Sequence, residues 1–265
     1  MVVTIIGGGN MGSAIARGLV QGSVFRPGDI TVVDISEAPL KALRDFNPVI
    51  RTALNKYDSV ENADLIILAV KPWLVKETIA NIRSGLDYSK QIVVSIAAGV
   101  SIRDLGEMLH KPDSEAALPA LFRVIPNTAI SIRQSVNLVA TENASPEQKQ
   151  LILKIFGELG YATLLDESKL NAGTALASCG IAYLFRYVRA AVLAGVEMGF
   201  YPKEAQTLVV KTMLGAASLL DETQENPEAE IDKVTTPGGI TIKGLNELET
   251  HGFSAAIIKA MKASR

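Results

Sequence analysis

The sequence contains few of the residues that build disulfides and metal centres. Cys179 is the only cysteine, and His110 and His251 are the only histidines. A single cysteine excludes an intramolecular disulfide and a cysteine-rich metal cluster, and two isolated histidines do not form a helical zinc motif. We therefore expect no metal site. The scarcity of cysteine favours a reducing, cytoplasmic environment.

The chain also lacks an excess of positive charge, internal repeats, low-complexity tracts and charge blocks. Its 26 Lys and Arg residues nearly balance its 28 Asp and Glu residues, which argues against a nucleic-acid-binding surface. Residues 1–6 lead straight into a glycine-rich turn, so no signal peptide is expected. The longest uncharged apolar segment, 172–185, is too short to span a bilayer and predicts a buried helix. Neither a nucleic acid nor a membrane is an expected partner.

Strand-like and helix-like segments alternate along the first half of the 265 residues. This alternation predicts an α/β fold with a Rossmann-like, doubly wound parallel sheet and helices on both faces. The expected strands are 2–6, 30–34, 65–70, 91–97, 122–125 and 137–141, and the expected helices are 12–21, 38–46, 76–82, 101–109 and 146–159.

A glycine-rich turn follows the first expected strand. Gly7, Gly9 and Gly12 have the G-x-G-x-x-G spacing, which allows a tight turn, close approach of a pyrophosphate and packing of helix on strand. The motif predicts a dinucleotide site at Gly7, Gly9, Asn10, Met11 and Gly12; the alternative is an ordinary tight turn.

Two further strand ends carry candidate cofactor residues. Asp34 ends the second strand, where a carboxylate binds ribose hydroxyls and repels a 2′-phosphate, so it favours NADH over NADPH; a simple turn Asp is the alternative. The third strand ends in Ala69, Val70, Lys71 and Pro72, at the edge of the sheet where ligands bind. Pro72 is equally consistent with a plain strand ending.

Strand signals stop after Asp166, and the remaining sequence has apolar residues at helical spacing. We expect a dinucleotide-binding domain over 1–162 and an all-helical domain for substrate binding and dimerisation over 163–265. Residues 168–198 are unusually rich in small apolar side chains, which suits close packing against a second subunit. The expected state is a homo-oligomer, at least a dimer.

Five phrases together resemble the pyrroline-5-carboxylate reductase family along essentially the whole chain: IGGGNMG at 6–12, AVKP at 69–72, SIAAGV at 95–100, RVIPNT at 123–128 and VTTPGGITIKGL at 234–245. The resemblance implies reduction of the small molecule Δ1-pyrroline-5-carboxylate to L-proline, the last step of proline biosynthesis, with NADPH or NADH as cofactor. Other interpretations are a different imine or 3-hydroxyacid reductase, which commonly uses a lysine, or a noncatalytic nucleotide-binding homologue.

The last phrase contains a turn rich in hydroxyl and N–H groups between two expected helices. Such a turn can bind a carboxylate, or it can simply cap a helix. The resemblance implies that the hydroxyls of Thr236 and Thr241 and the main-chain N–H groups of Gly239 and Ile240 bind the substrate carboxylate.

The resemblance also assigns roles to Thr174, Asn127 and Asn55. Thr174 is the implied catalytic residue, facing the ring nitrogen of the substrate, where a hydroxyl orients the nitrogen or relays a proton. A buried Thr bonded to its own helix is the alternative. Asn127 is implied to line the nicotinamide pocket, although an Asn after proline is ordinary turn chemistry, and Asn55 is implied to contact adenosine.

One segment departs from the family pattern. The family normally reads Ser-Gly-Ser-Gly-Pro-Ala-Tyr after the catalytic threonine, whereas this chain has ASCGIAY at 177–183. Ile181 in place of proline is expected to remove a helix kink and to restore an N–H group. Cys179 is interpreted as a packed thiol, not a nucleophile.

Overall fold

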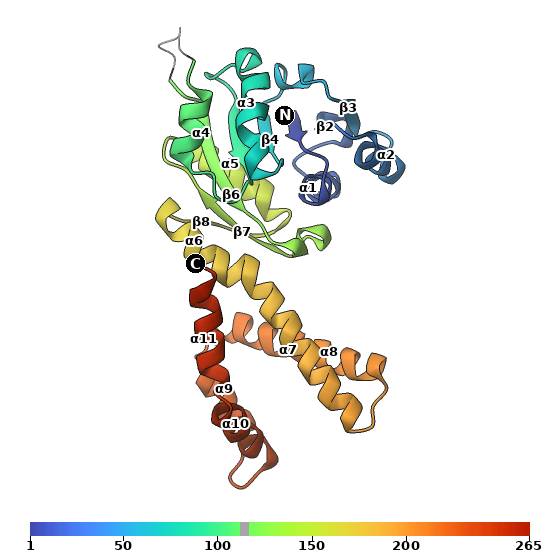
Figure 1. Ribbon diagram of the computed structural model, residues 1–265, viewed down its shortest axis with the longest axis vertical. Helices are drawn as coiled ribbons and strands as arrows, with labels where there is room; N and C mark the ends of the chain where they lie inside the picture. Colours follow the sequence, from blue (N-terminus) through green and yellow to red (C-terminus); the bar gives the residue numbers. More distant parts are fainter. Residues whose placement is uncertain (112–116) are drawn as a thin grey trace. The chain divides into compact units, whose positions relative to one another are not determined.

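The computed structural model describes residues 1–111 and 117–265 (Figure 1). The chain folds into two compact units, Met1–Ser178 and Cys179–Arg265. The first unit contains β1 (Val3–Ile6), α1 (Asn10–Val20), β2 (Ile30–Asp34), α2 (Glu37–Phe46), β3 (Arg51–Leu54), β4 (Leu65–Leu68), α3 (Val75–Ile82), β5 (Ile92–Ser95), α4 (Ile102–Leu109), β6 (Ala120–Ile125), β7 (Ser135–Ala140), α5 (Pro146–Gly157), β8 (Gly160–Leu164) and α6 (Leu170–Gly173).

The strands form one sheet in the order β3-β2-β1-β4-β5-β6-β7-β8. Every pairing is parallel except that of β6 with β7. This arrangement confirms the expected Rossmann-like sheet. The chain moves outward from β1 to β2 and β3, and then crosses to the other side of β1 to form β4. The strand order therefore reverses between β1 and β4, which is where open α/β sheets bind ligands.

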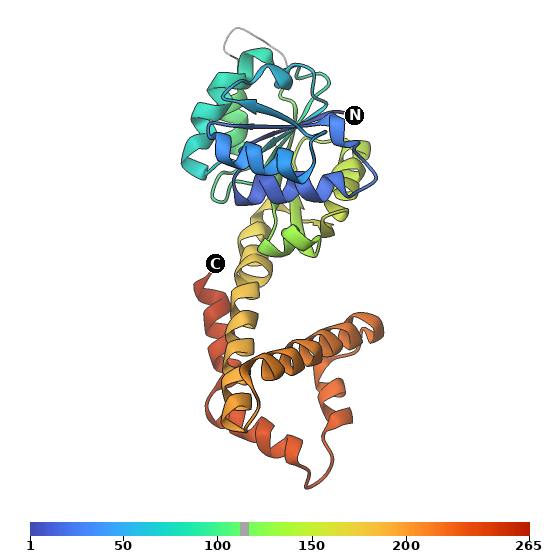
Figure 2. The ribbon, with the colours of Figure 1, turned by 90° about the vertical axis from the view of Figure 1, so that its right-hand side faces the viewer.

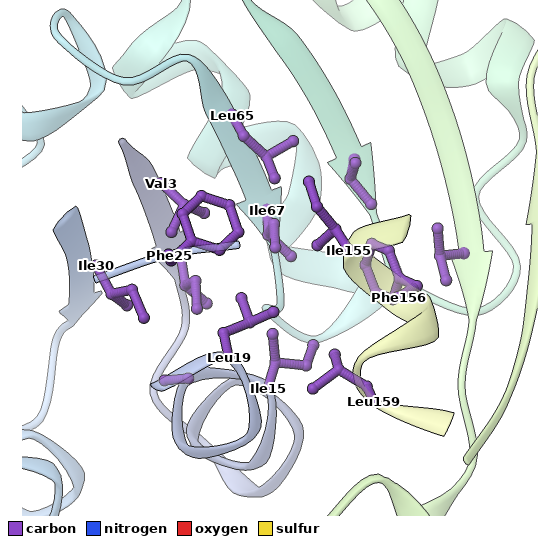
Figure 3. Packing of buried hydrophobic residues seen from close by; sticks show 14 of the residues in the cluster. Val3, Ile15, Leu19, Phe25, Ile30, Leu65, Ile67, Ile155, Phe156 and Leu159 are labelled. Carbon is purple, nitrogen blue, oxygen red and sulfur yellow. The ribbon is translucent and has the colours of Figure 1, made fainter. Parts of the chain in front are cut away.

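Central strands alternate their side chains between two apolar cores, one on each face of the sheet. Ile67 points into a core shared with α1, α2 and α5, whereas the next residue in β4, Leu68, points into a core shared with α3 and α4. Figure 3 shows Ile15 and Leu19 of α1 facing Leu65 and Ile67 across the first core. Because both faces are covered, the central strands are continuous apolar runs.

Two strands were not expected from the sequence. Both β3 and β8 lie at the edges of the sheet, and all their residues are partly buried or exposed. An edge strand is stabilised by backbone pairing with one neighbour, so it needs no apolar run. The segments Arg51–Leu54 and Gly160–Leu164 consequently lack the pattern that marks a buried strand.

The second unit is helical throughout, as expected. It contains α7 (Gly180–Glu197), α8 (Pro202–Thr223), α9 (Pro227–Val234), α10 (Ile240–Thr250) and α11 (Phe253–Ala263). In Figure 2, α11 runs beside the first turns of α7. The Tyr183 hydroxyl on α7 contacts the Ser264 hydroxyl and donates to the Ala260 carbonyl at 3.4 Å, which ties the two helices together.

The helix expected to be buried is largely exposed within its own chain. The helical run Glu167–Glu197 is long and apolar enough to cross a membrane by length and composition, and only 17% of its most apolar window is buried. It is longer than the expected apolar segment 172–185. Exposed large side chains on α7 include Leu184 at 53% and Phe185 at 63%. Exposed apolar surfaces of this kind are typical of sites that contact another protein, a ligand or a membrane.

Residues 167–178 pack onto the sheet of the first unit. Glu167 forms an ion pair with Arg123 of β6 at 2.7 Å and accepts the N–H of Ile102 at 2.8 Å. Leu170 is fully buried in the second core. The first compact unit consequently extends to Ser178, whereas the division into domains at 162/163 stays a prediction.

Candidate cofactor and active site

A cleft of about 680 Å³ opens at the carboxyl ends of β1, β2, β4 and β5. It lies at the point where the strand order reverses, so the topology alone makes it the favoured ligand site. Nine of the predicted cofactor residues line this cleft: Gly7, Gly9, Asn10, Met11, Asp34, Ala69, Val70, Lys71 and Pro72.

The glycine-rich turn is shaped by close backbone contacts. Gly7 has a φ of 106°, and a Cβ atom there would lie 2.6 Å from the Ala69 carbonyl oxygen. A Cβ atom on Gly12 would lie 1.8 Å from the Gly7 carbonyl oxygen, whereas one on Gly9 would meet no atom within 4 Å. Gly12 therefore packs α1 against the turn beneath the cleft, while Gly9 leaves open space at its surface.

The N-terminus of α1 points its first amides into this space. Gly9 is the N-cap residue and supplies no side chain to bind them. The first amides of a helix have no acceptor within the helix, and the helix dipole adds positive potential there. This end of α1 is therefore suited to the oxygens of a pyrophosphate.

Asp34 is held rigidly at the end of β2. Its Oδ2 accepts the Gly8 N–H at 2.6 Å, and its Oδ1 accepts the Ser36 N–H at 2.8 Å. Each carboxylate oxygen keeps acceptor capacity after one such bond. The side chain is thus fixed beside the glycine turn in a form that still accepts hydrogen bonds from the two hydroxyls of a ribose.

The cleft is also lined by residues that were not predicted as cofactor-binding residues from the sequence. Tyr57, Glu77 and Asn81 line one side, and residues 96–98 line another. Residues 96–98 belong to the SIAAGV phrase that follows β5, so their motif was visible although no role was given to it. Tyr57, Glu77 and Asn81 come from a loop and from one face of α3, and no local pattern marks them.

Asn55 and Asn127 do not line the cleft. Asn55 is exposed in the left-handed region with a φ of 49°, and its N–H donates to the Asp34 carbonyl at 2.8 Å. Asn127 is buried after β6, where its Oδ1 accepts the Ala129 N–H at 3.0 Å and its Nδ2 donates to the Ala177 carbonyl at 3.3 Å. Their roles toward a cofactor stay predictions.

Thr174 begins a π-helical turn, Thr174–Cys179. Its Oγ1 donates to the Leu170 carbonyl at 2.7 Å, which is the back-bonded arrangement. Since the hydroxyl hydrogen is used in this bond, the oxygen is left with acceptor capacity only. In this rotamer Thr174 can receive a hydrogen bond from a protonated nitrogen but cannot donate one to it.

The carboxylate-binding turn predicted in the second unit lies between α9 and α10, as expected. Gly238 has a φ of 71°, and the Gly239 N–H donates to the Thr236 carbonyl at 3.0 Å. Gly239 is the N-cap of α10, so the free helical amides begin at Ile240. Thr236, Ile240 and Thr241 are exposed. Helical amides beside two hydroxyls suit a carboxylate, but the N–H of Gly239 is already engaged.

The geometry of the first unit is by itself suited to binding a nicotinamide dinucleotide. An open glycine surface, unpaired helix amides and an ordered acceptor for ribose hydroxyls meet at one end of the sheet. Within the described residues, no cluster of three or more His, Cys, Asp or Glu side chains could hold a metal ion. Fold and site define a dinucleotide-binding oxidoreductase of the Rossmann type.

Family models match both ends of the chain. Residues 167–265 match the model for pyrroline-5-carboxylate reductase dimerisation, and residues 2–99 match the model for NADP oxidoreductase, coenzyme F420-dependent. The first match covers α7 and the other apolar helices. It supports oligomerisation through this region.

Proteins named as pyrroline-5-carboxylate reductases resemble the chain over nearly its whole length. Pyrroline-5-carboxylate reductase from Methanosarcina acetivorans is 34% identical over 98% of this chain and 93% of its own. Pyrroline-5-carboxylate reductase 1 from Dictyostelium discoideum is 35% identical over 99% of this chain, which spans only 48% of that longer protein. The structure of a pyrroline-5-carboxylate reductase from Coxiella burnetii superposes with a TM-score of 0.88 at 29% identity, covering 99% of this chain and 95% of the other. The chain belongs to the pyrroline-5-carboxylate reductase family.

Proposed function

We propose that this chain catalyses the NAD(P)H-dependent reduction of Δ1-pyrroline-5-carboxylate to L-proline, the last step of proline biosynthesis. The observation that carries the proposal is the whole-length relationship to reductases of this name, at 34% identity to the Methanosarcina acetivorans enzyme. The cleft at the end of β1 and β4 supports it, because a reductase of this kind needs a dinucleotide site there.

The residues of the first unit hold the cofactor, which supplies the hydride when bound. The first amides of α1 bind its pyrophosphate, and the open surface at Gly9 lets the phosphates approach the backbone. Asp34 accepts hydrogen bonds from the adenosine ribose. Since its carboxylate would repel a 2′-phosphate, we infer a preference for NADH over NADPH.

Thr174 orients the ring nitrogen of the substrate. Its hydroxyl hydrogen is committed to the Leu170 carbonyl, so its oxygen accepts the N–H of the protonated imine. The hydroxyl thereby favours the cationic imine, whose carbon is the more electrophilic form toward hydride. The proton on nitrogen comes from solvent, because an alcohol in this arrangement is not an acid at neutral pH.

The turn between α9 and α10 binds the substrate carboxylate in this proposal. The helical amides from Ile240 onward and the hydroxyls of Thr236 and Thr241 are the donors. We infer that the chain acts as a homo-oligomer, at least a dimer, through the exposed apolar face of α7. A cytoplasmic location remains an expectation from the low cysteine content.

The test is to mix the purified protein with pyrroline-5-carboxylate and either NADH or NADPH, and to follow the absorbance of the reduced nicotinamide. We expect oxidation of the cofactor with formation of proline, faster with NADH. Cofactor binding without turnover on this substrate would refute the proposed reaction. Equal rates with both cofactors would refute only the inferred role of Asp34 and would leave the proposed reaction in place.

A further inference from the structure

The segment that departs from the family pattern contains a structural irregularity. Residues Thr174–Cys179 form a π-helical turn, in which each bond spans one residue more than in an α-helix. Proline at position 181 would explain such a turn, because proline removes the N–H that an α-helix directs to the carbonyl of residue 177. This chain has Ile181, which keeps that N–H. The widened turn therefore needs another cause.

Two hydrogen bonds tie the widened turn to the end of β6. The Ser178 hydroxyl donates to the Pro126 carbonyl at 3.0 Å, and the Asn127 Nδ2 donates to the Ala177 carbonyl at 3.3 Å. Each side supplies one donor: Ser178 donates from the π turn, and Asn127 donates from the segment after β6. Together they hold two successive residues of the π turn.

The segment after β6 that forms these bonds is itself held in place. The Asn127 N–H donates at 2.9 Å to the hydroxyl of Ser135, which is 1% exposed, and the Asn127 Oδ1 caps the following 3-10 turn. All residues of β6 are buried. The π turn is consequently fastened to the core of the sheet, and Thr174 lies one helical turn before the fastened residues.

We propose that Ser178 is a positioning residue for Thr174 in this chain. Its bond to Pro126, with that of Asn127 to Ala177, selects the widened turn over a regular α-helix and so fixes the direction of the Thr174 hydroxyl. The family phrase has glycine at position 178 and proline at 181, so it lacks this hydroxyl and carries a residue that disfavours a regular α-helix. In this chain the Ser178 hydroxyl takes the place of that backbone constraint. The proposal rests on the proposed role of Thr174 in imine reduction.

The central test is Ser178→Ala, with Ser178→Thr as the variant that keeps the hydroxyl. Ser178→Ala removes one hydrogen bond that positions Thr174, so it should lower kcat roughly three- to tenfold. The KM for the cofactor should stay within about twofold of the wild type. Ser178→Thr should retain kcat within about twofold. Ser131→Ala is the matched control, because its hydroxyl also donates to a carbonyl, that of Thr128, but does not reach the π turn.

Two further measurements separate positioning from general damage. With deuterated cofactor, Ser178→Ala should raise the primary isotope effect on kcat, because hydride transfer becomes more rate-limiting. Without any cofactor, amide hydrogen exchange over 174–181 should be faster in Ser178→Ala than in the wild type or in Ser131→Ala. The exchange measurement does not depend on activity, so it tests the two bonds even if the wild type proves inactive on pyrroline-5-carboxylate.

The double variant Ser178→Gly with Ile181→Pro tests the replacement of one constraint by the other. It should recover most of the kcat that Ser178→Gly alone loses. No recovery, or a large loss of thermal stability in the double variant, would overturn that replacement. Unchanged kcat and unchanged exchange in Ser178→Ala would overturn the positioning role. A fall in cofactor affinity and in melting temperature alongside the fall in kcat would also overturn the positioning role, because it would indicate damage to the whole fold.

Discussion

Two glycines of the turn after β1 should separate folding from cofactor binding. Gly12→Ala places a Cβ atom 1.8 Å from the Gly7 carbonyl oxygen, where ordinary contact begins at 3.4 Å. The turn or α1 must move by about 1.6 Å, the difference between these two distances. Overpacking of this kind costs about 1–3 kcal/mol or more, and the movement also displaces the first amides of α1. We expect both the free energy of unfolding and the affinity for NADH to fall.

Gly9→Ala is the matched variant, because its Cβ atom meets no protein atom within 4 Å. Gly9 has a φ of −64°, which any residue adopts, so only its preference as an N-cap changes, at a cost of about 1 kcal/mol or less. The added methyl group does, however, occupy the surface where a pyrophosphate would lie. We expect the Kd for NADH to rise about tenfold or more, a loss of about 1.4 kcal/mol, with nearly unchanged stability.

Urea unfolding and fluorescence titration with NADH measure the two quantities independently. Normal NADH affinity in Gly9→Ala would refute the placement of the pyrophosphate at this turn. Wild-type stability in Gly12→Ala would refute the packing argument. A loss of stability in Gly9→Ala as large as that in Gly12→Ala would refute the distinction between the open site at Gly9 and the packed site at Gly12.

Three other substitutions test the cofactor preference, the active site and the core. Asp34→Ser should shift the ratio of kcat/KM toward NADPH, since it removes the charge that repels a 2′-phosphate; an unmoved ratio would make Asp34 a turn residue only. Thr174→Ala should lower kcat roughly ten- to a thousandfold while Thr174→Ser retains most of it, and equal rates in Thr174→Ala would eliminate the hydroxyl from the reaction. Glu167→Ala should lower the free energy of unfolding by about 3–5 kcal/mol, because it leaves the Arg123 side chain, 8% exposed, without its partner. The control is Glu107→Ala, which breaks an ion pair whose side chains are 85% and 65% exposed and should cost less than about 1 kcal/mol. Similar losses in these two variants, measured by urea unfolding, would show that burial does not set the contribution of the Arg123 pair.

The pattern of residues along the sequence was sufficient to predict the structural features that depend on local geometry. The spacing of Gly7, Gly9 and Gly12 predicts a turn between strand and helix, and the backbone contacts of Gly7 and Gly12 leave no room for a Cβ atom. Apolar runs predict the central strands, since both faces of those strands are buried. The order of motifs indicated the family, and the comparisons confirmed it.

Other features depend on contacts between distant segments, which no local pattern reveals. The edge strands β3 and β8 exist through backbone pairing with β2 and β7, so their side chains need not be apolar. The Asn127 side chain donates to the carbonyl of Ala177, 50 positions along the chain, and Asn127 is not among the residues that line the cleft. Ile181 in place of proline predicts a helix without a kink, whereas Thr174–Cys179 form a π turn. Two hydrogen bonds join this turn to Pro126 and Asn127, which follow β6. The sequence by itself determined the central strands, the dinucleotide turn and the family, because these depend on local patterns. Only the tertiary structure decided the edge strands and the contacts of the segment after Thr174, because these depend on residues distant in the chain.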